Sequence, residues 1–147
     1  MTDETPSRLM GLPTWLISQT SMQAHRLLSE AFAATDSRGY HYRLLAALEE
    51  FGPASQATLG RRTGIDRSDV VAALNDLADR GLIERSPDPS DRRRNIVTVT
   101  PAGREQFHRL DKVLAGVQDD LLAPLSATER DQLVRLLTRV LAHHGQR

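Results

Sequence analysis

The stretch from residue 55 to residue 99 constrains the fold most, because its helix and turn signals follow one another in a fixed, short order. Ser55 can cap a short helix that Gly64 ends, since glycine suits the position just after a helix terminus. Asp66 can cap a longer helix, and Gly81 ends that helix. Two helices joined by a turn of a few residues indicate a helix-turn-helix.

Two β-rich runs follow this pair of helices, at residues 82–85 and 96–99. The residues between them, 87–95, open with proline, aspartate and serine, which favour a turn, and the tip of this turn carries three consecutive arginines. A helix-turn-helix followed by a β-hairpin is a winged helix. The sequence therefore predicts a mainly α fold with a small β-hairpin wing.

Further helices are predicted on both sides of this module. Apolar spacing indicates helices over residues 15–34 and 40–51, and residues 1–12 are expected to form a frayed arm. A longer helix starts at residue 101, where a threonine cap precedes a proline, and a last helix follows the capping box at 126–129.

The first helix and the last two helices each carry an apolar stripe that a small winged helix does not need for its own core. We therefore expect these three helices to pack against their copies in a second chain, as a helical dimerisation platform. A two-fold dimer of winged modules suits a pseudo-palindromic DNA site. The alternative is that the three helices form a bundle within one chain.

Composition excludes several classes of protein. The 19 basic and 19 acidic residues give a formal net charge of zero, which argues against a protein that coats nucleic acid indiscriminately. There is no cysteine, so disulfides and thiolate metal sites are excluded. No apolar run approaches the roughly 20 residues of a membrane span, so we expect a cytoplasmic protein with no membrane partner.

Motifs for catalysis are missing from the sequence. It contains no nucleophile elbow, no phosphate-binding glycine loop and no pair of carboxylates that would share a cleft. The histidines of the predicted interior helices are dispersed, with no pair at metal-binding spacing. We therefore expect no enzyme activity, no cofactor and no metal site.

Two segments together resemble a known family. Asp88-Pro89-Ser90-Asp91-Arg92-Arg93, followed by Val97-Thr98-Val99-Thr100-Pro101-Ala102-Gly103, resembles the wing signature of the MarR family of transcriptional regulators. Val99 stands where the family signature has leucine. Gly64-Ile65-Asp66-Arg67-Ser68 and Gly81-Leu82-Ile83-Glu84-Arg85 are similar to the helix-turn-helix frame of the family. The resemblance covers about residues 12–144.

This resemblance implies a single domain over residues 1–147, in which 40–100 form the winged helix-turn-helix and 12–35 and 101–144 the dimerisation region. It implies a homodimeric, sequence-specific DNA-binding regulator, a repressor that a small effector, often aromatic, releases from double-stranded DNA. The alternative is a winged helix used for protein contact or dimerisation without DNA binding. The zero net charge and an apolar stretch in the recognition helix favour it, whereas the arginine-rich wing argues against it.

The wing supplies the first candidate DNA contacts. Arg93 resembles the wing arginine of the family, and Asp91 its orienting carboxylate. A narrow minor groove has an enhanced negative potential that attracts an inserted arginine, and a carboxylate two residues away can hold the guanidinium. Arg92 and Arg94 are expected to serve phosphates or the base of the wing. The alternative for all four residues is a solvated charged tip.

The two helices of the helix-turn-helix supply the remaining candidates. Arg67 and Ser68 at the start of the longer helix can meet phosphate or base edges, and Arg67 could reach guanine. Asp69 could accept from cytosine or cap the helix, while Val71 or Ala72 could contact thymine methyl groups. Three residues of the shorter helix are candidate phosphate contacts, with a solvated face as the alternative for the two arginines: Thr58, Arg61 and Arg62.

An effector pocket is expected between the platform and the winged module. Its candidate lining residues are polar-aromatic side chains from the first, second and fifth helices: Trp15, His25, His41, Tyr42 and His108. The alternative for each histidine alone is a structural residue whose hydrogen bonds are satisfied within the fold.

Overall fold

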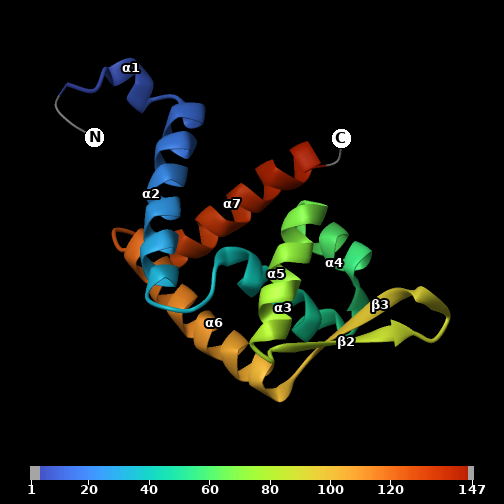
Figure 1. Cartoon of the computed structure of the whole chain (residues 1–147). Coiled ribbons are helices and arrows are strands. Elements are labelled where there is room, and N and C mark those ends of the chain that lie inside the picture. The colour runs from blue at the N-terminus through green and yellow to red at the C-terminus, as the bar shows by residue number, and fades with distance from the viewer. Residues whose placement is uncertain (1–3, 146–147) are drawn as a thin grey trace.

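The computed structural model describes residues 4–145, which form seven helices and three short strands within that range (Figure 1). In chain order the elements are α1 (Ser7–Met10), α2 (Pro13–Ala33), α3 (Gly39–Phe51), β1 (Ala54–Ser55), α4 (Gln56–Thr63), α5 (Arg67–Asp79), β2 (Ile83–Asp88), β3 (Asp91–Val99), α6 (Pro101–Leu121) and α7 (Ala127–Gly145). The mainly α fold with a small β-hairpin wing is confirmed.

The N-terminal segment is more ordered than a frayed arm. Residues 7–10 form the short helix α1, because the carbonyl of Pro6 accepts bonds from the backbone N–H groups of Leu9 and Met10. Residues 1–3 of the predicted arm lie outside the described residues. Pro13 occupies the first turn of α2, where its missing N–H costs no hydrogen bond.

The helix-turn-helix consists of α4 and α5. Ser55 caps α4 by accepting from the backbone N–H of Thr58 at 3.2 Å. Gly64 follows with φ of 67°, a left-handed conformation that glycine adopts without steric cost. Asp66 precedes α5, but within the described chain its side chain accepts no capping bond, so that prediction is wrong; its backbone carbonyl instead accepts from Val70 N at 2.9 Å.

The sheet is antiparallel, with strand order β1-β3-β2. The two-residue strand β1 was not predicted; it pairs Ala54 with Val97, far along the chain. Strands β2 and β3 also continue further than the sequence indicates, so the wing stays paired down to Asp88 and Asp91 and the predicted long turn is reduced to its tip. The hairpin projects from the helices on the side opposite α2 (Figure 1).

The core lies where α3, α4, α5 and α6 meet the sheet. The side chains that are almost fully buried come from all of these elements: Leu44, Leu45, Leu48, Leu59, Val70, Leu74, Leu77, Val97 and Leu110. Leu110 anchors α6 in this core, and Phe32 at the end of α2 joins the same cluster. The winged module and α6 therefore share one hydrophobic core.

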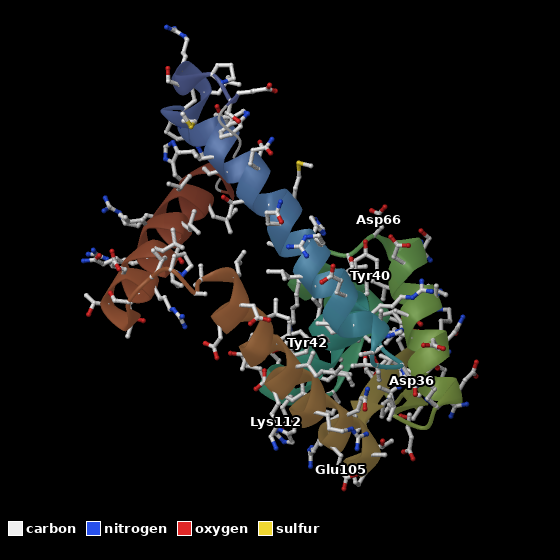
Figure 2. The ribbon with its side chains drawn as sticks, turned by 90° about the vertical axis from the view of Figure 1, so that its left-hand side faces the viewer. Asp36, Tyr40, Tyr42, Asp66, Glu105 and Lys112 are labelled. Atoms are coloured by element: carbon white, nitrogen blue, oxygen red, sulfur yellow. The ribbon has the colours of Figure 1, made fainter. Side chains whose placement is uncertain are left out.

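Helix α7 remains outside that core. Between Ala127 and Gly145 no residue is buried, and Leu136, Leu137 and Val140 are about half exposed. In Figure 2 α7 lies at the left, apart from the winged module at the right. Within residues 4–145, none of the helices combines the length and hydropathy that a membrane span requires.

Candidate DNA-binding interface

The tip of the wing is organised by Asp91. One oxygen of its carboxylate, Oδ1, accepts from the backbone N–H of Arg93 at 3.1 Å and from Arg93 Nε at 3.3 Å. The Arg93 side chain is otherwise 92% exposed, so most of its donors face solvent. The backbone N–H and Nε of Arg93 are therefore bonded to Asp91, while the rest of its guanidinium is exposed. The spacing of two residues between Asp91 and Arg93 indicates this arrangement.

Asp88 is predicted only as part of the wing turn, and the structure gives it a further role. It is buried, and its Oδ1 accepts from Ser90 N at 2.9 Å and from Ser90 Oγ at 2.7 Å. These bonds from Ser90, followed by the charge of Arg94, lower the pKa of the Asp88 carboxyl. The Asp-Pro-Ser run was the available signal, because an aspartate that bonds the backbone two residues on makes a tight turn.

Arg94 lies between two carboxylates. Its NH2 is 3.6 Å from Asp88 Oδ2 and its Nε is 3.9 Å from Asp91 Oδ2. Among the described residues Arg92 has no such carboxylate partner. The three consecutive arginines therefore differ: Arg94 is paired with two carboxylates at the base of the tip, whereas Arg92 and Arg93 present more of their charge to solvent.

A groove of about 640 Å³ separates the wing from the helix-turn-helix. Its apolar lining includes Ile65 and Val71, and four arginines from three different elements contribute to its lining: Arg61, Arg67, Arg93 and Arg94. Four guanidinium groups around one groove concentrate positive potential locally although the whole chain has no net charge. A polyanionic strand is the ligand that such a groove suits.

The other predicted contacts of the helix-turn-helix lie outside the lining of this groove. Ser68 and Ala72 are exposed on α5, and Asp69 is partly buried in its first turn. The Thr58 hydroxyl accepts from Arg61 NH2 at 3.1 Å and so orients that arginine. Arg62 stacks on the exposed ring of Phe51, 4.7 Å from the ring centroid.

Comparison with known proteins agrees with this architecture. A sequence model described as "MarR family" matches residues 35–94, the winged part of the chain. The PcaV transcriptional regulator of Streptomyces coelicolor, solved with its natural ligand, is 32% identical over 91% of this chain and 94% of its own, with a TM-score of 0.76. This chain belongs to the MarR family.

One further relative and one further solved structure are informative. The HTH-type transcriptional repressor NicR of Pseudomonas putida is 32% identical over 66% of this chain and 61% of its own length. The chain spans 59–61% of the length of three such curated relatives. MarR of Escherichia coli, solved with operator DNA, is 24% identical with a TM-score of 0.74, over 86% of this chain and 91% of its own, and shares the fold.

The five residues predicted for an effector pocket are dispersed in this MarR-family chain. Trp15 lies near the start of α2, while His108 is exposed on α6 beside Phe107. Tyr42 stacks on Phe107 and donates to Asp111 Oδ1 at 2.7 Å, in the part of Figure 2 where α3 meets α6. Burial, then this hydrogen bond, raises the pKa of Tyr42 to about 12.

His41 is buried at the start of α3 rather than aimed into a cavity. Its Nδ1 accepts from the backbone N–H of Arg38 at 2.9 Å, and its Nε2 is 3.0 Å from Asp76 Oδ2 on α5. An Nδ1 that accepts carries no proton, so the neutral ring keeps its proton on Nε2. Burial lowers the pKa of His41; Asp76 opposes this shift, while Arg80 and Arg38 add to it.

One residue of the predicted set, His25, lines a described cavity. It lines a pocket of about 720 Å³ between the second half of α2 and the start of α3. The sequence reasoning missed the cationic and aromatic side chains that share this pocket: Arg38, Tyr40 and Arg43. No local pattern marks them, because the pocket exists only where the end of α2 meets the beginning of α3.

Proposed function

We propose that this chain is a homodimeric, sequence-specific DNA-binding regulator of transcription. The observation that carries the proposal is the groove between α5 and the wing, because Arg61 and Arg67 from the helices there face Arg93 and Arg94 from β3. Phosphate contacts of this kind fix the register of a protein on a duplex, while base edges are read by the recognition helix.

The docking follows from this geometry. Helix α5 enters the major groove with Arg67 and Ser68 at its N-terminus, where backbone N–H groups also favour a phosphate. The sugar-phosphate backbone that separates the major groove of the duplex from its minor groove lies in the arginine-lined groove of the protein. Arg93, free beyond its contact with Asp91, reaches the adjacent minor groove. Arg92 serves a flanking phosphate.

The dimer is formed by residues 12–35 and 101–144, while residues 40–100 bind DNA. Support comes from α7, whose apolar stripe of Leu136, Leu137, Val140 and Leu141 is between 45% and 74% exposed in a single chain. Leu16, Ile17 and Met22 of α2 are exposed as well. Covering two such stripes with a second copy places two recognition helices for successive half-sites.

The regulator responds to a small, aromatic effector and acts as a repressor. The pocket between α2 and α3 supports this, because Leu28 and Phe32 offer apolar walls while Arg38 and Arg43 offer positive charge. An aromatic carboxylate matches both features. Two relatives support a ligand-responsive repressor, since NicR is named a repressor and PcaV was solved with its natural ligand.

The test begins with fragmented genomic DNA of the source organism, from which the purified dimer should retain a small set of fragments at low salt. Fluorescence anisotropy on a retained duplex should then show a binding constant whose logarithm falls linearly with the logarithm of the salt concentration. Benzoate and hydroxybenzoates added to the complex should release the duplex. A protein that retains no fragment at low salt would instead be a protein-contact module, and the proposal would fail.

A further inference from the structure

The segment between α2 and α3, residues 34–38, is a built element rather than a loose connection. Thr35 Oγ1 donates to the carbonyl of Phe32 at 2.8 Å and accepts from Ser37 N at 3.1 Å. Ser37 is 3% exposed. The same segment forms one wall of the pocket between α2 and α3, and Asp36 and Tyr40 mark it in Figure 2.

The recognition helix is bound to this wall at its C-terminal end. Arg80, the residue that caps α5, donates through NH1 to the carbonyl of Asp36 at 2.8 Å and to Ser37 Oγ at 3.3 Å. One turn earlier on α5, Asp76 contacts His41 at the start of α3. Arg80 and Asp76, one turn apart on α5, thus both contact the segment from residue 36 to residue 41.

The long helix α6 is bound to the same hydroxyl. Gln106, buried on α6, donates through Nε2 to Ser37 Oγ at 2.8 Å. Its Oε1 is occupied by Arg109, which donates from Nε at 3.1 Å and from NH2 at 2.8 Å. Because the amide oxygen already accepts from Arg109, the amide nitrogen is the group that faces Ser37. Ser37 therefore joins the DNA-reading helix to the dimerisation region.

We propose that Arg80 is a positioning residue of the DNA reader, which couples the orientation of α5 to the pocket wall through Asp36 and Ser37. The proposal rests on the proposed function, since it assumes that α5 binds DNA and that the pocket takes the effector. A ligand that shifts the wall moves two acceptors of one guanidinium, and α5 moves with them. Coupling between two sites is reciprocal, so DNA bound to α5 must also change the stability of the wall.

Reciprocity allows a test without an identified effector. Hydrogen–deuterium exchange is measured for peptides covering residues 33–43, in the dimer alone and saturated with a retained duplex. In the wild-type protein we expect exchange there to slow by about fivefold or more, the lower end of typical coupling. Arg80→Ala should bind the duplex but lose most of this slowing, because the guanidinium that joins α5 to Asp36 and Ser37 is gone and only the contact of Asp76 with His41 remains.

Two controls separate positioning from general destabilisation. Arg80→Lys retains a cation that can reach the carbonyl of Asp36, and it should recover part of the slowing. Asp79→Asn alters the exposed neighbouring residue on α5 and should behave as the wild type. Peptides around Leu110 of α6, which belongs to the core, report whether the fold is intact. If Arg80→Ala does not fold, Ser37→Ala removes the shared hydroxyl without altering α5 and should weaken the slowing.

The inference is overturned if the wild-type wall does not respond while the duplex is bound. It is also overturned if the response persists in the folded Arg80→Ala protein at saturating duplex, or in Ser37→Ala where that variant replaces it. A protein that binds no duplex at all would instead refute the proposed function, so the two failures are distinguishable.

Discussion

Asp91 accepts from both the backbone and the side chain of Arg93, at 3.1 Å and 3.3 Å, through a single carboxylate oxygen. The backbone bond shapes the tip of the wing, and the side-chain bond aims a guanidinium that stays 92% exposed. A residue held in this way loses less conformational freedom on binding than a free arginine would.

The first prediction concerns this arginine. Arg93→Ala should weaken binding to the retained duplex by about 1–3 kcal/mol, roughly 5- to 150-fold, in line with specific contacts to nucleic acid. Anisotropy titrations at fixed salt measure the effect. Arg139→Ala, which removes an exposed arginine from α7, is the matched control and should bind as the wild type. Unchanged affinity in Arg93→Ala would remove the wing from the mechanism.

The second prediction compares two glycines of α6. A Cβ at Gly103 would run into the carbonyl of Leu82 and lie 2.7 Å from Val99 Cγ2, whereas a Cβ at Gly116 meets nothing within 4 Å. Gly103→Ala should therefore destabilise the fold by about 1–3 kcal/mol through overpacking. Gly116→Ala should stabilise it by up to about 1 kcal/mol, since alanine is the better helix former. Urea unfolding of both variants at one protein concentration measures the two changes in the free energy of unfolding. Equal changes in the two variants would refute the close approach of Gly103 to Leu82.

The third prediction is a dependence of stability on pH that arises from His41. Burial lowers the pKa of His41 in the fold, whereas the unfolded chain binds a proton near the ordinary value of about 6.5. Below that pH the unfolded state binds more protons, so the free energy of unfolding should fall as pH drops, until the folded ring is protonated too. Protonation would also displace the bond from Arg38 N to Nδ1.

Urea midpoints at pH 7.5 and 5.5, taken at a fixed protein concentration, measure this dependence. His41→Gln removes the titrating ring, so its midpoint should change less between the two pH values than that of the wild type. The same change in both proteins would show that His41 is not the group responsible.

The fourth prediction concerns the dimer. Leu137→Glu places a charge in the apolar stripe of α7, where the side chain is 45% exposed in one chain and covered in the proposed dimer. Sedimentation should show monomers at concentrations where the wild type is dimeric, and duplex affinity should fall because two half-sites are no longer bound together. Gln132→Glu adds the same charge on the polar face and should leave the dimer intact. A dimeric Leu137→Glu protein would place the interface elsewhere.

Much of the fold could be predicted because its signals are local. The cap at Ser55, the cap of Thr100 on Gly103 N and the reciprocal bonds of Ser126 and Glu129 each join residues only three apart. The contact of Asp91 with Arg93 spans two residues. Interactions of that range depend on side-chain chemistry and spacing, which the printed sequence contains.

The residues predicted for an effector pocket show what side-chain chemistry and spacing do not specify. Histidines and aromatic side chains have the chemistry to bind an aromatic effector, but in the fold His41 contacts Asp76 and Tyr42 stacks on Phe107. Arg38 and Arg43, which have no distinguishing pattern in the sequence, line the pocket between α2 and α3 together with His25. Which face of a helix is covered depends on how α2 crosses α3, and apolar spacing alone does not determine that crossing.

The sequence by itself determined the order of the six longer helices and the two wing strands, the turn between α4 and α5 and the charged tip of the wing, because neighbours along the chain specify them. Tertiary structure alone decided that Arg61 and Arg67 share a groove with Arg93 and Arg94, and that Ser37 joins Arg80 to Gln106. These contacts connect residues tens of positions apart, so they exist only after the core of α3, α5 and α6 has set the angles between the helices.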